Sequence, residues 1–244
     1  MRTVASTSID CNGQLDHHVF EHFDAPERLV AMTDYPVSLY IEGKRCLIVG
    51  GGSVATRKAH GLLDAGAQVT VISPLLTGEF PASQVRHIAD IYRVEYLVRL
   101  KPFLVFAATY DADVNQQIAH DAHENGILVN IVDGGESDFS NMTLLRREPL
   151  TIAISTGGAS PLLGQHLRDA IDDAVGDHYP LLAQWLGDLR PQVIERLPEQ
   201  ALRYAFWQQV MDSDAIKLLK DGQQQAAYDR LITLLDDAVR EVST

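Results

Sequence analysis

The chain has 244 residues, of which 46% are hydrophobic and 22% are charged. This length and composition are typical of a globular protein with one large core, or with one domain and a smaller partner. The formal net charge of -13 argues against non-specific binding to nucleic acid or to anionic lipid. A local basic pocket can still bind an anionic substrate.

The predicted elements divide the chain at Tyr35. Residues 1–34 are polar and weakly periodic, and we interpret them as an N-terminal extension. From Tyr35 onward, apolar strands alternate with helices, which predicts a Rossmann-type α/β fold with a doubly wound parallel sheet covered on both faces. We expect strands at 45–49, 68–73, 84–88, 103–109 and 127–133, and helices at 54–66 and 112–126.

The pattern changes again after residue 133. A polar connection at 134–143 leads to a strand at 150–156 and a helix that begins at Pro161. From about residue 177 only helical patterns occur, interrupted by prolines and a glycine. We therefore predict four regions: the extension 1–34, a Rossmann domain 35–142, a small strand-helix segment 143–176, and a helical C-terminal domain 177–244.

A glycine-rich turn, "GGGSVA", lies between the strand 45–49 and the following helix. Gly50, Gly52 and Ala55 fit the pattern G-x-G-x-x-A. The first glycine permits a tight turn, the second lets a pyrophosphate approach the backbone, and the helix N-terminus offers N–H groups. We expect a dinucleotide site here, to which Gly51 and the Ser53 hydroxyl also contribute; the alternative is a turn required only for packing.

The carboxylate that usually follows the second strand of such a motif is missing. No Asp or Glu occurs between Ala65 and Gly78, and Ser73 and Pro74 occupy the strand end. The adenosine ribose must then be held by backbone groups or by the Ser73 hydroxyl. The motif therefore does not choose between NAD and NADP.

Four segments of the chain together carry a family resemblance. "YPVSLYIEGKRCLIVGGGSVATRKAHGLLDAGAQVTVISP", "FLVFAATYDADVNQQI", "LVNIVD" and "RREPLTIAISTGGASPLLGQHLRDAI" occur in this order, from Tyr35 to Asp173. They resemble the precorrin-2 dehydrogenase family of sirohaem biosynthesis, which includes bifunctional dehydrogenase/ferrochelatases. The resemblance implies NAD-dependent oxidation of precorrin-2 to sirohydrochlorin. In some members the same cleft also inserts Fe²⁺ to give sirohaem.

The resemblance also implies cofactor contacts and a homodimer whose segment 143–176 exchanges contacts between subunits. In family members NAD is contacted at the positions of Ser53, Val54, Pro74 and Leu75, so main-chain groups replace the missing acid. Thr109, at the end of the strand 103–109, completes the expected set. The full set of expected cofactor residues is Gly50, Gly51, Gly52, Ser53, Val54, Ser73, Pro74, Leu75 and Thr109.

Asp133 is the expected catalytic residue, because it matches the aspartate that closes "NIVD" in the family. Ligands bind beyond the carboxyl ends of parallel strands, and a carboxylate there can accept the proton that accompanies hydride removal. The alternative is that Asp133 only caps the turn before Gly134.

The segment "STGGASP" precedes the helix at Pro161, and a helix N-terminus suits a tetrapyrrole substrate rich in carboxylates. Ser160 is also a candidate N-cap. Two adjacent arginines could neutralise substrate acetates and propionates, or could be ordinary solvated charges. The expected substrate contacts are Arg146, Arg147, Thr156, Gly157, Gly158 and Ser160.

Several classes of protein receive little support. Cys11 and Cys46 are the two cysteines, which gives neither a disulfide framework nor a cysteine metal site. The groups His17, His18, His22 and His120, His123 are interpreted as surface histidines, so no metal site is expected. The chain has no signal-like start and no membrane-length apolar run, and we expect a cytoplasmic protein without membrane or nucleic-acid partners.

Two rival functions stay open. One is a Rossmann module that senses NAD(H) and regulates a partner. The other is a protein that carries a tetrapyrrole or inserts its metal without dehydrogenase activity. The sequence does not decide whether chelation occurs or which metal is preferred.

Overall fold

The computed structural model describes residues 7–9, 15–17, 35–132 and 134–242. It divides into two compact units, residues 1–36 and 37–244. In the first unit, β1 (Thr7–Ile9) pairs with β2 (Leu15–His17) in an antiparallel ladder. No strand was expected in this part of the chain.

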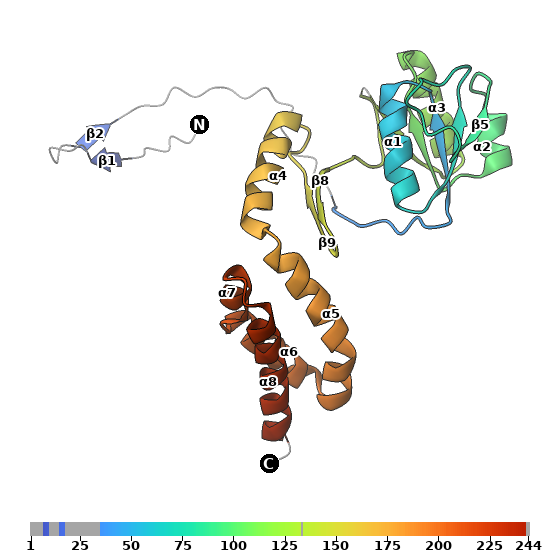
Figure 1. Ribbon diagram of the computed structural model, residues 1–244. Helices are drawn as coiled ribbons and strands as arrows, with labels where there is room; N and C mark the ends of the chain where they lie inside the picture. Colours follow the sequence, from blue (N-terminus) through green and yellow to red (C-terminus); the bar gives the residue numbers. More distant parts are fainter. Residues whose placement is uncertain (1–6, 10–14, 18–34, 133, 243–244) are drawn as a thin grey trace. The chain divides into compact units, whose positions relative to one another are not determined.

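The second unit contains a five-stranded parallel sheet with the strand order β5-β4-β3-β6-β7 (Figure 1). Its central strands are short and apolar on both faces, as expected for a sheet covered by helices on each side. In β3 every residue after the first is buried, and β6 is buried throughout. The strands are β3 (Arg45–Val49), β4 (Gln68–Ile72), β5 (Arg86–Ile88), β6 (Leu104–Ala107) and β7 (Leu128–Ile131).

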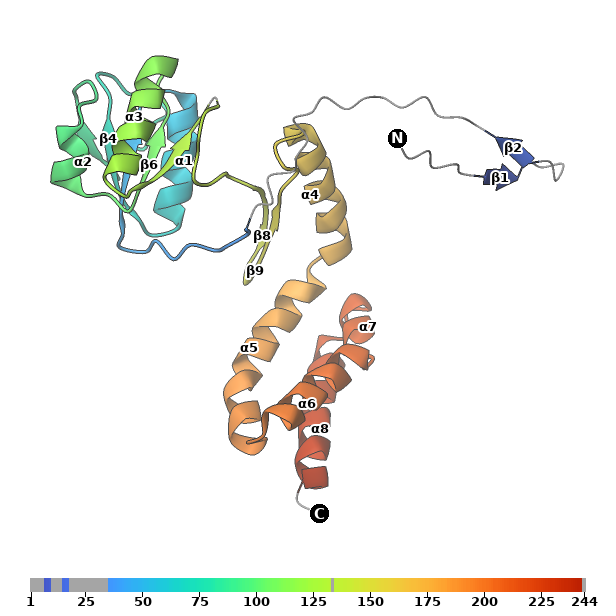
Figure 2. The same ribbon diagram turned by 180° about the vertical axis from the view of Figure 1, so that it is seen from behind.

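Helices cover both faces of this sheet, so the fold is doubly wound (Figures 1 and 2). One apolar cluster joins α1 (Ser53–Asp64) to the side chains of Ile48 and Phe106. A second cluster joins α2 (Glu95–Leu100) and α3 (Ala112–Glu124) to the opposite face. The predicted fold class is therefore confirmed.

A two-stranded antiparallel sheet follows the parallel one. It pairs β8 (Thr143–Arg147) with β9 (Leu150–Ile154), and α4 (Pro161–Val175) packs against β8. A Cβ atom on Gly164 of α4 would lie 2.6 Å from the Thr143 Oγ1 atom, so the two elements pack closely there.

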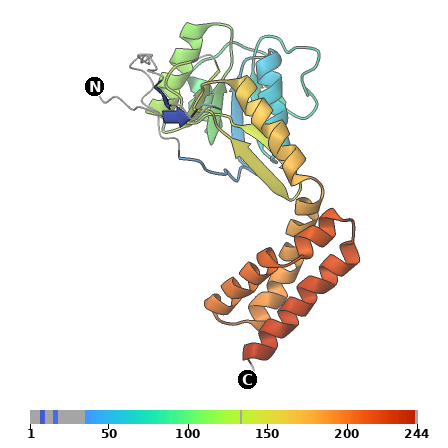
Figure 3. The same cartoon turned by 90° about the vertical axis from the view of Figure 1, so that its left-hand side faces the viewer.

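The C-terminal part consists of helices that share one apolar core (Figure 3). Phe206, Leu189, Leu231 and Leu235 are fully buried in this core. Its helices are α5 (His178–Arg196), α6 (Gln200–Asp212), α7 (Ala215–Lys220) and α8 (Gln224–Val242).

Besides β1 and β2, two elements were not expected. The six-residue helix α2 is too short for its period to show in the sequence. Strand β8 begins at Thr143, the last residue of the segment that we interpreted as a polar connection, and its pattern "TLLRR" is not strictly alternating. It forms because it pairs residue by residue with β9.

Candidate functional site

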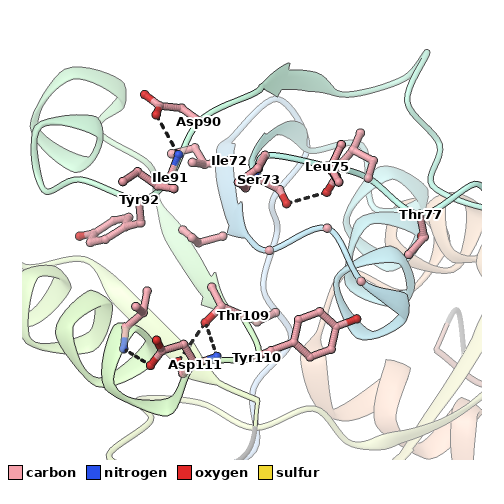
Figure 4. Close-up of a pocket in the computed structure, with 18 residues that line it drawn as sticks. Ile72, Ser73, Leu75, Thr77, Asp90, Ile91, Tyr92, Thr109, Tyr110 and Asp111 are labelled. Atoms are coloured by element: carbon pink, nitrogen blue, oxygen red, sulfur yellow. Dashed lines mark hydrogen bonds between the residues drawn. The ribbon is translucent and has the colours of Figure 1, made fainter.

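A cavity of about 600 Å³ lies at the carboxyl ends of β3, β4 and β6. In an open α/β sheet this is the edge where ligands bind, beside the point at which the strand order reverses. Side chains that follow β4, β5 and β6 surround it (Figure 4). The lining residues are Val49, Gly50, Gly51, Gly52, Ile72, Ser73, Pro74, Leu75, Leu76, Thr77, Asp90, Ile91, Tyr92, Ala108, Thr109, Tyr110, Asp111 and Val114.

The glycine turn leaves no room for side chains. Gly50 has a φ of 127°, and a Cβ atom on it would lie 2.2 Å from the Ala108 carbonyl oxygen. A Cβ atom on Gly51 would lie 2.0 Å from the Leu75 carbonyl oxygen. Glycine is therefore required at both positions, because the turn presses against the backbone that follows β4 and β6.

The turn ends at the N-terminus of α1, which suits an anion. Gly52 is the N-cap residue and supplies no side-chain hydrogen bond to the first turn of the helix. The N–H groups there are free of a side-chain cap, and the positive end of the helix dipole lies beside the cavity. Together with the close backbone, these groups can hold a pyrophosphate.

The end of β4 carries the residues expected in place of an acid. Ser73 is buried, and its hydroxyl donates to the Leu75 carbonyl oxygen at 2.6 Å. Because its proton is already donated to Leu75, the Ser73 hydroxyl can only accept a hydrogen bond from a ligand hydroxyl. The Leu75 side chain is 80% exposed although it lines the cavity.

An acidic residue does line the cavity, but it follows the next strand of the sheet. Asp90 follows β5, and its side chain is 28% exposed. Its Oδ1 atom accepts from the Ile91 N–H group at 2.8 Å, and its Oδ2 atom accepts from Arg93 and from the Tyr96 hydroxyl. The hydrogen bond from Arg93, followed by those from Tyr96 and Ile91, lowers the pKa of Asp90 to about 2.

The loop that contains Asp90 is tied to α3. The Tyr92 hydroxyl donates to the buried Asp121 at 2.8 Å, and Gln117 donates to the other oxygen of that carboxylate at 2.7 Å. Burial, and then the hydrogen bond to Asp121, raises the pKa of Tyr92 above its ordinary value. Tyr92 therefore remains a hydrogen-bond donor at all ordinary pH values.

The end of β6 is held by a buried amide. The Asn115 Oδ1 atom accepts from the Thr109 N–H group at 3.0 Å and from its hydroxyl at 2.8 Å, while the Asn115 Nδ2 atom donates to the Thr109 carbonyl at 3.1 Å. Asp111 caps α3 by accepting from the backbone N–H groups of Asp113 and Val114. The Tyr110 hydroxyl lies over Gly52, within 2.6 Å of where a Cβ atom would stand.

Seven of the nine expected cofactor residues line the cavity, namely Gly50, Gly51, Gly52, Ser73, Pro74, Leu75 and Thr109. Ser53 and Val54, in the first turn of α1, are not among its lining residues. Sequence reasoning missed Asp90, Ile91 and Tyr92. Their position just after the predicted strand 84–88 was the available signal.

The expected substrate residues do not line this cavity, and the expected catalytic residue is not among the described ones. Asp133 lies outside the described residues, as do His18 and His22. Thr156 exchanges hydrogen bonds with the Ser160 backbone, and the Ser160 side chain accepts from the Leu163 N–H group at 3.2 Å as the N-cap of α4. The six expected substrate residues, Arg146, Arg147, Thr156, Gly157, Gly158 and Ser160, do not line the cavity.

The two arginines differ in their surroundings. Arg147 forms ion pairs with Asp172 and with Asp177, the latter at 2.6 Å. These partners, Asp172 foremost, raise the pKa of Arg147. Arg146 is exposed on β8. Its charge is therefore the more accessible of the two for an anionic ligand.

The described ranges contain neither a candidate metal centre nor a candidate membrane span. No three His, Cys, Asp or Glu side chains in those ranges gather in a way that could hold a metal ion. Of the helices described, none has the length and apolar composition that a membrane span requires.

Three family models match consecutive parts of the chain. Residues 37–142 match a model described as "Putative NAD(P)-binding". Residues 147–174 match "Sirohaem biosynthesis protein central", and residues 178–235 match "Sirohaem synthase dimerisation region". The cavity lies within the first of these matches.

Comparison with known proteins gives relatives of the same kind. The sirohaem synthase of Nitrosomonas eutropha is 37% identical over 214 residues, which cover 85% of this chain and 44% of the relative. That of Methylococcus capsulatus is 37% identical over 219 residues, which cover 85% and 45%. This chain thus spans less than half the length of these curated relatives.

A solved structure, "SirC, precorrin-2 dehydrogenase", is similar over its whole length. It superimposes with a TM-score of 0.66 at 28% sequence identity, covering 82% of this chain and 100% of that one.

Proposed function

The chain belongs to the sirohaem synthase family, and from this premise we propose that it is an NAD-dependent precorrin-2 dehydrogenase that produces sirohydrochlorin. The observation that carries the proposal is the glycine turn pressed against the ends of β4 and β6 beside the 600 Å³ cavity. The similarity to a solved precorrin-2 dehydrogenase, over 82% of this chain and the whole of that one, supports it independently.

We propose that NAD lies across the carboxyl edge of the sheet. Its pyrophosphate sits on Gly50, Gly51 and Gly52 at the N-terminus of α1, where close backbone and the helix dipole favour it. The adenosine half extends over the ends of β4 and β5, and the nicotinamide half extends over β6 and β7. Ser53 and Val54 border the pyrophosphate from the first helical turn.

Asp133 is proposed as the catalytic base. The bound nicotinamide supplies the acceptor for a hydride from a ring carbon of precorrin-2. The Asp133 carboxylate accepts the proton that the substrate loses in the same oxidation. Its place in the sequence, two residues after the end of β7, supports this role, because ligands bind beyond the carboxyl ends of parallel strands.

We propose that the hairpin and the N-terminus of α4 bind the substrate. The Arg146 charge, the exposed Thr156 loop and the dipole of α4 suit the acetate and propionate groups of a tetrapyrrole. Arg147, already paired with Asp172 and Asp177, serves chiefly to hold β8 against the end of α4. Gly157 and Gly158, both with positive φ, shape the turn that leads into the helix.

The assembly and region boundaries are also part of this proposal. The match of residues 178–235 to a dimerisation region supports a homodimer. We propose an extension 1–34, an NAD-binding domain 35–142, a dimerisation and substrate segment 143–176, and a helical C-terminal domain 177–244. We place the enzyme in the cytoplasm and propose Fe²⁺ as a second substrate in the same cleft.

The test is a set of four reactions with the purified chain: precorrin-2 with and without NAD, each with and without Fe²⁺. The sirohydrochlorin absorption spectrum should develop only with NAD, and the sirohaem spectrum only when Fe²⁺ is also present. Asp133→Asn should abolish the oxidation. The matched control is Asp113→Asn, an exposed carboxylate in the first turn of α3, which should leave the rate unchanged.

Each contrary result has a defined meaning. Normal turnover by Asp133→Asn would remove that residue from the mechanism. NAD binding without oxidation would favour the NAD(H)-sensing module. Iron insertion into supplied sirohydrochlorin, without NAD binding, would favour the metal-insertion protein.

A further inference from the structure

Asp90 and Ile91 form a polar and apolar pair at one end of the cavity. They come just after Ala89, the residue that follows β5, and β5 lies beside β4 at the edge of the sheet. Figure 4 shows them on the side of the cavity formed after β5, away from Thr109 and Asp111 after β6. Nothing in the glycine turn requires a carboxylate at this place, so its presence in the cavity needs a separate explanation.

The Asp90 carboxylate has one acceptor position left. A carboxylate offers about four lone-pair positions. Ile91 uses one on Oδ1, while Arg93 and Tyr96 use two on Oδ2. The remaining position lies on Oδ1. With a pKa of about 2, the group is ionised at neutral pH and can only accept hydrogen bonds from a ligand.

Two exposed aliphatic side chains line the same cavity. Leu75 is 80% exposed and Ile91 is 64% exposed, yet both line the cavity. Large aliphatic groups left in water cost free energy that a flat apolar ligand can recover by covering them. A ligand that fits both features is an aromatic heterocycle with an exocyclic hydrogen-bond donor.

The direction of the bound dinucleotide decides which of its two rings reaches this place. The glycine turn after β3 holds the pyrophosphate, and Asp133 follows β7. The nicotinamide half must therefore extend toward β6 and β7. The remaining half, the adenosine, extends over β4 toward β5, where Asp90 and Ile91 lie.

On the proposed function as its basis, we propose that Asp90 and Ile91 recognise the adenine base of the cofactor. The Asp90 Oδ1 atom accepts a hydrogen bond from the exocyclic 6-amino group, and the side chains of Ile91 and Leu75 pack on the ring. Asp90 thereby selects adenine over a purine that carries a carbonyl group at position 6.

The surroundings hold this pair in place before the ligand arrives. Tyr96 and Arg93 fix the Asp90 carboxylate, and Tyr92 ties the next residues to Asp121 of α3. Because the acceptor is already held in place, little entropy is lost in ordering it when the ligand binds. The preference for adenine should therefore appear as a difference between dissociation constants. A carboxylate contact to the ribose 2′-hydroxyl is the competing arrangement, and it makes a different prediction.

The test measures dissociation constants by calorimetry for NAD, nicotinamide hypoxanthine dinucleotide and NADP, with the full chain and no precorrin-2. The wild type should prefer NAD over the hypoxanthine analogue about tenfold, the value of one hydrogen bond to a charged group. Asp90→Asn should remove or reverse this preference, because its amide nitrogen can donate to the 6-carbonyl group.

Two further variants complete the design. Ile91→Ala should weaken the binding of NAD and of the hypoxanthine analogue by the same factor. The ratio of the two dissociation constants should stay unchanged. Glu95→Gln, which changes an exposed carboxylate at the first residue of α2, should change neither constant. Thermal unfolding shows whether each variant is folded. If Asp90→Asn does not fold, Ile91→Ala still tests whether this part of the cavity contacts the base.

The proposal is overturned if the wild type binds both dinucleotides equally, or if Asp90→Asn weakens both by one factor. It is also overturned if Asp90→Asn improves NADP binding without changing the base preference, because the carboxylate would then face the ribose. These outcomes leave the dehydrogenase proposal standing. Loss of dinucleotide binding altogether in the wild type would instead contradict the proposed function itself.

Discussion

Two cavities of similar volume lie at opposite ends of the same parallel strands. The one at the carboxyl end has about 600 Å³ and is built from glycine, backbone and exposed aliphatic side chains. The one near the amino ends of β3, β4 and β5 has about 500 Å³ and is lined by Arg45, Arg86 and Arg99. No glycine lies among the described residues around this second cavity.

The difference shows that volume alone does not make a dinucleotide site. At the carboxyl end, the backbone after β4 and β6 approaches the turn so closely that any Cβ atom at Gly50 or Gly51 would overlap it. At the amino end, flexible arginine stems surround the space, and their charges can move into water. Fixed backbone donors, rather than mobile cations, distinguish the first cavity.

The largest expected effect comes from closing the carboxyl-end cavity. Gly51→Ala places a Cβ atom 2.0 Å from the Leu75 carbonyl oxygen, so the loop after β4 must move. We expect destabilisation by about 2–3 kcal/mol and loss of measurable NAD binding. Urea unfolding and calorimetric titration with NAD measure the two effects.

The matched control is Gly61→Ala on the same α1 helix, where an added Cβ atom meets nothing within 4 Å. It should stabilise the chain by about 0.5–1 kcal/mol and leave NAD binding unchanged. If Gly51→Ala bound NAD as tightly as the wild type, the close approach of the backbone would not be required for NAD binding.

A smaller effect is expected at the end of β6. Asn115→Ala removes three hydrogen bonds to the half-buried Thr109, two of them made by its backbone N–H and carbonyl groups. The cost should be about 2 kcal/mol in stability, with NAD affinity about tenfold weaker because Thr109 loses its position. His120→Ala, exposed on the same helix, should change stability by less than about 0.5 kcal/mol.

The pH dependence of stability tests whether the pKa of Asp90 is lowered in the folded chain. Its pKa is about 2 in the folded chain and near 3.8 otherwise. Its contribution is therefore fully present above about pH 5 and is lost as the pH falls from there toward 2. The difference in unfolding free energy between wild type and Asp90→Asn should be constant from about pH 5 to 7 and shrink in acid. A difference of equal size at about pH 3 and pH 6 would show that the folded pKa is not lowered.

The smallest effect is expected at the amino end of the sheet. Arg86→Ala removes one of the three arginines around the second cavity. Because this cavity lies at the far end of the strands, the NAD dissociation constant should stay within about twofold of wild type, and stability within about 0.5 kcal/mol. A large loss of NAD affinity in this variant would contradict the assignment of NAD to the cavity at the carboxyl ends of the strands.

Features that depend on neighbouring residues could be predicted from the sequence. The apolar run "RCLIV", the helix after it and the glycine turn between them are local patterns, and the structure confirms the strand and the helix to within a few residues. Ser160 was also a candidate cap, and it caps α4 through a hydrogen bond within its own turn. Such features need only the geometry of a few consecutive residues.

Features that depend on strand order could not be predicted. The sequence lacks an acid after β4, and only the lateral pairing of β5 with β4 brings Asp90 into the cavity. Likewise, the glycine pattern could be recognised, but the atoms that forbid a side chain, the Ala108 and Leu75 carbonyl oxygens, belong to other strand ends. The sequence alone thus determined the periodic elements and the dinucleotide turn, whereas tertiary structure decided which distant backbone and side-chain groups complete the site. The reason is that hydrogen-bonded strand neighbours are set by packing of the whole sheet and not by any local preference.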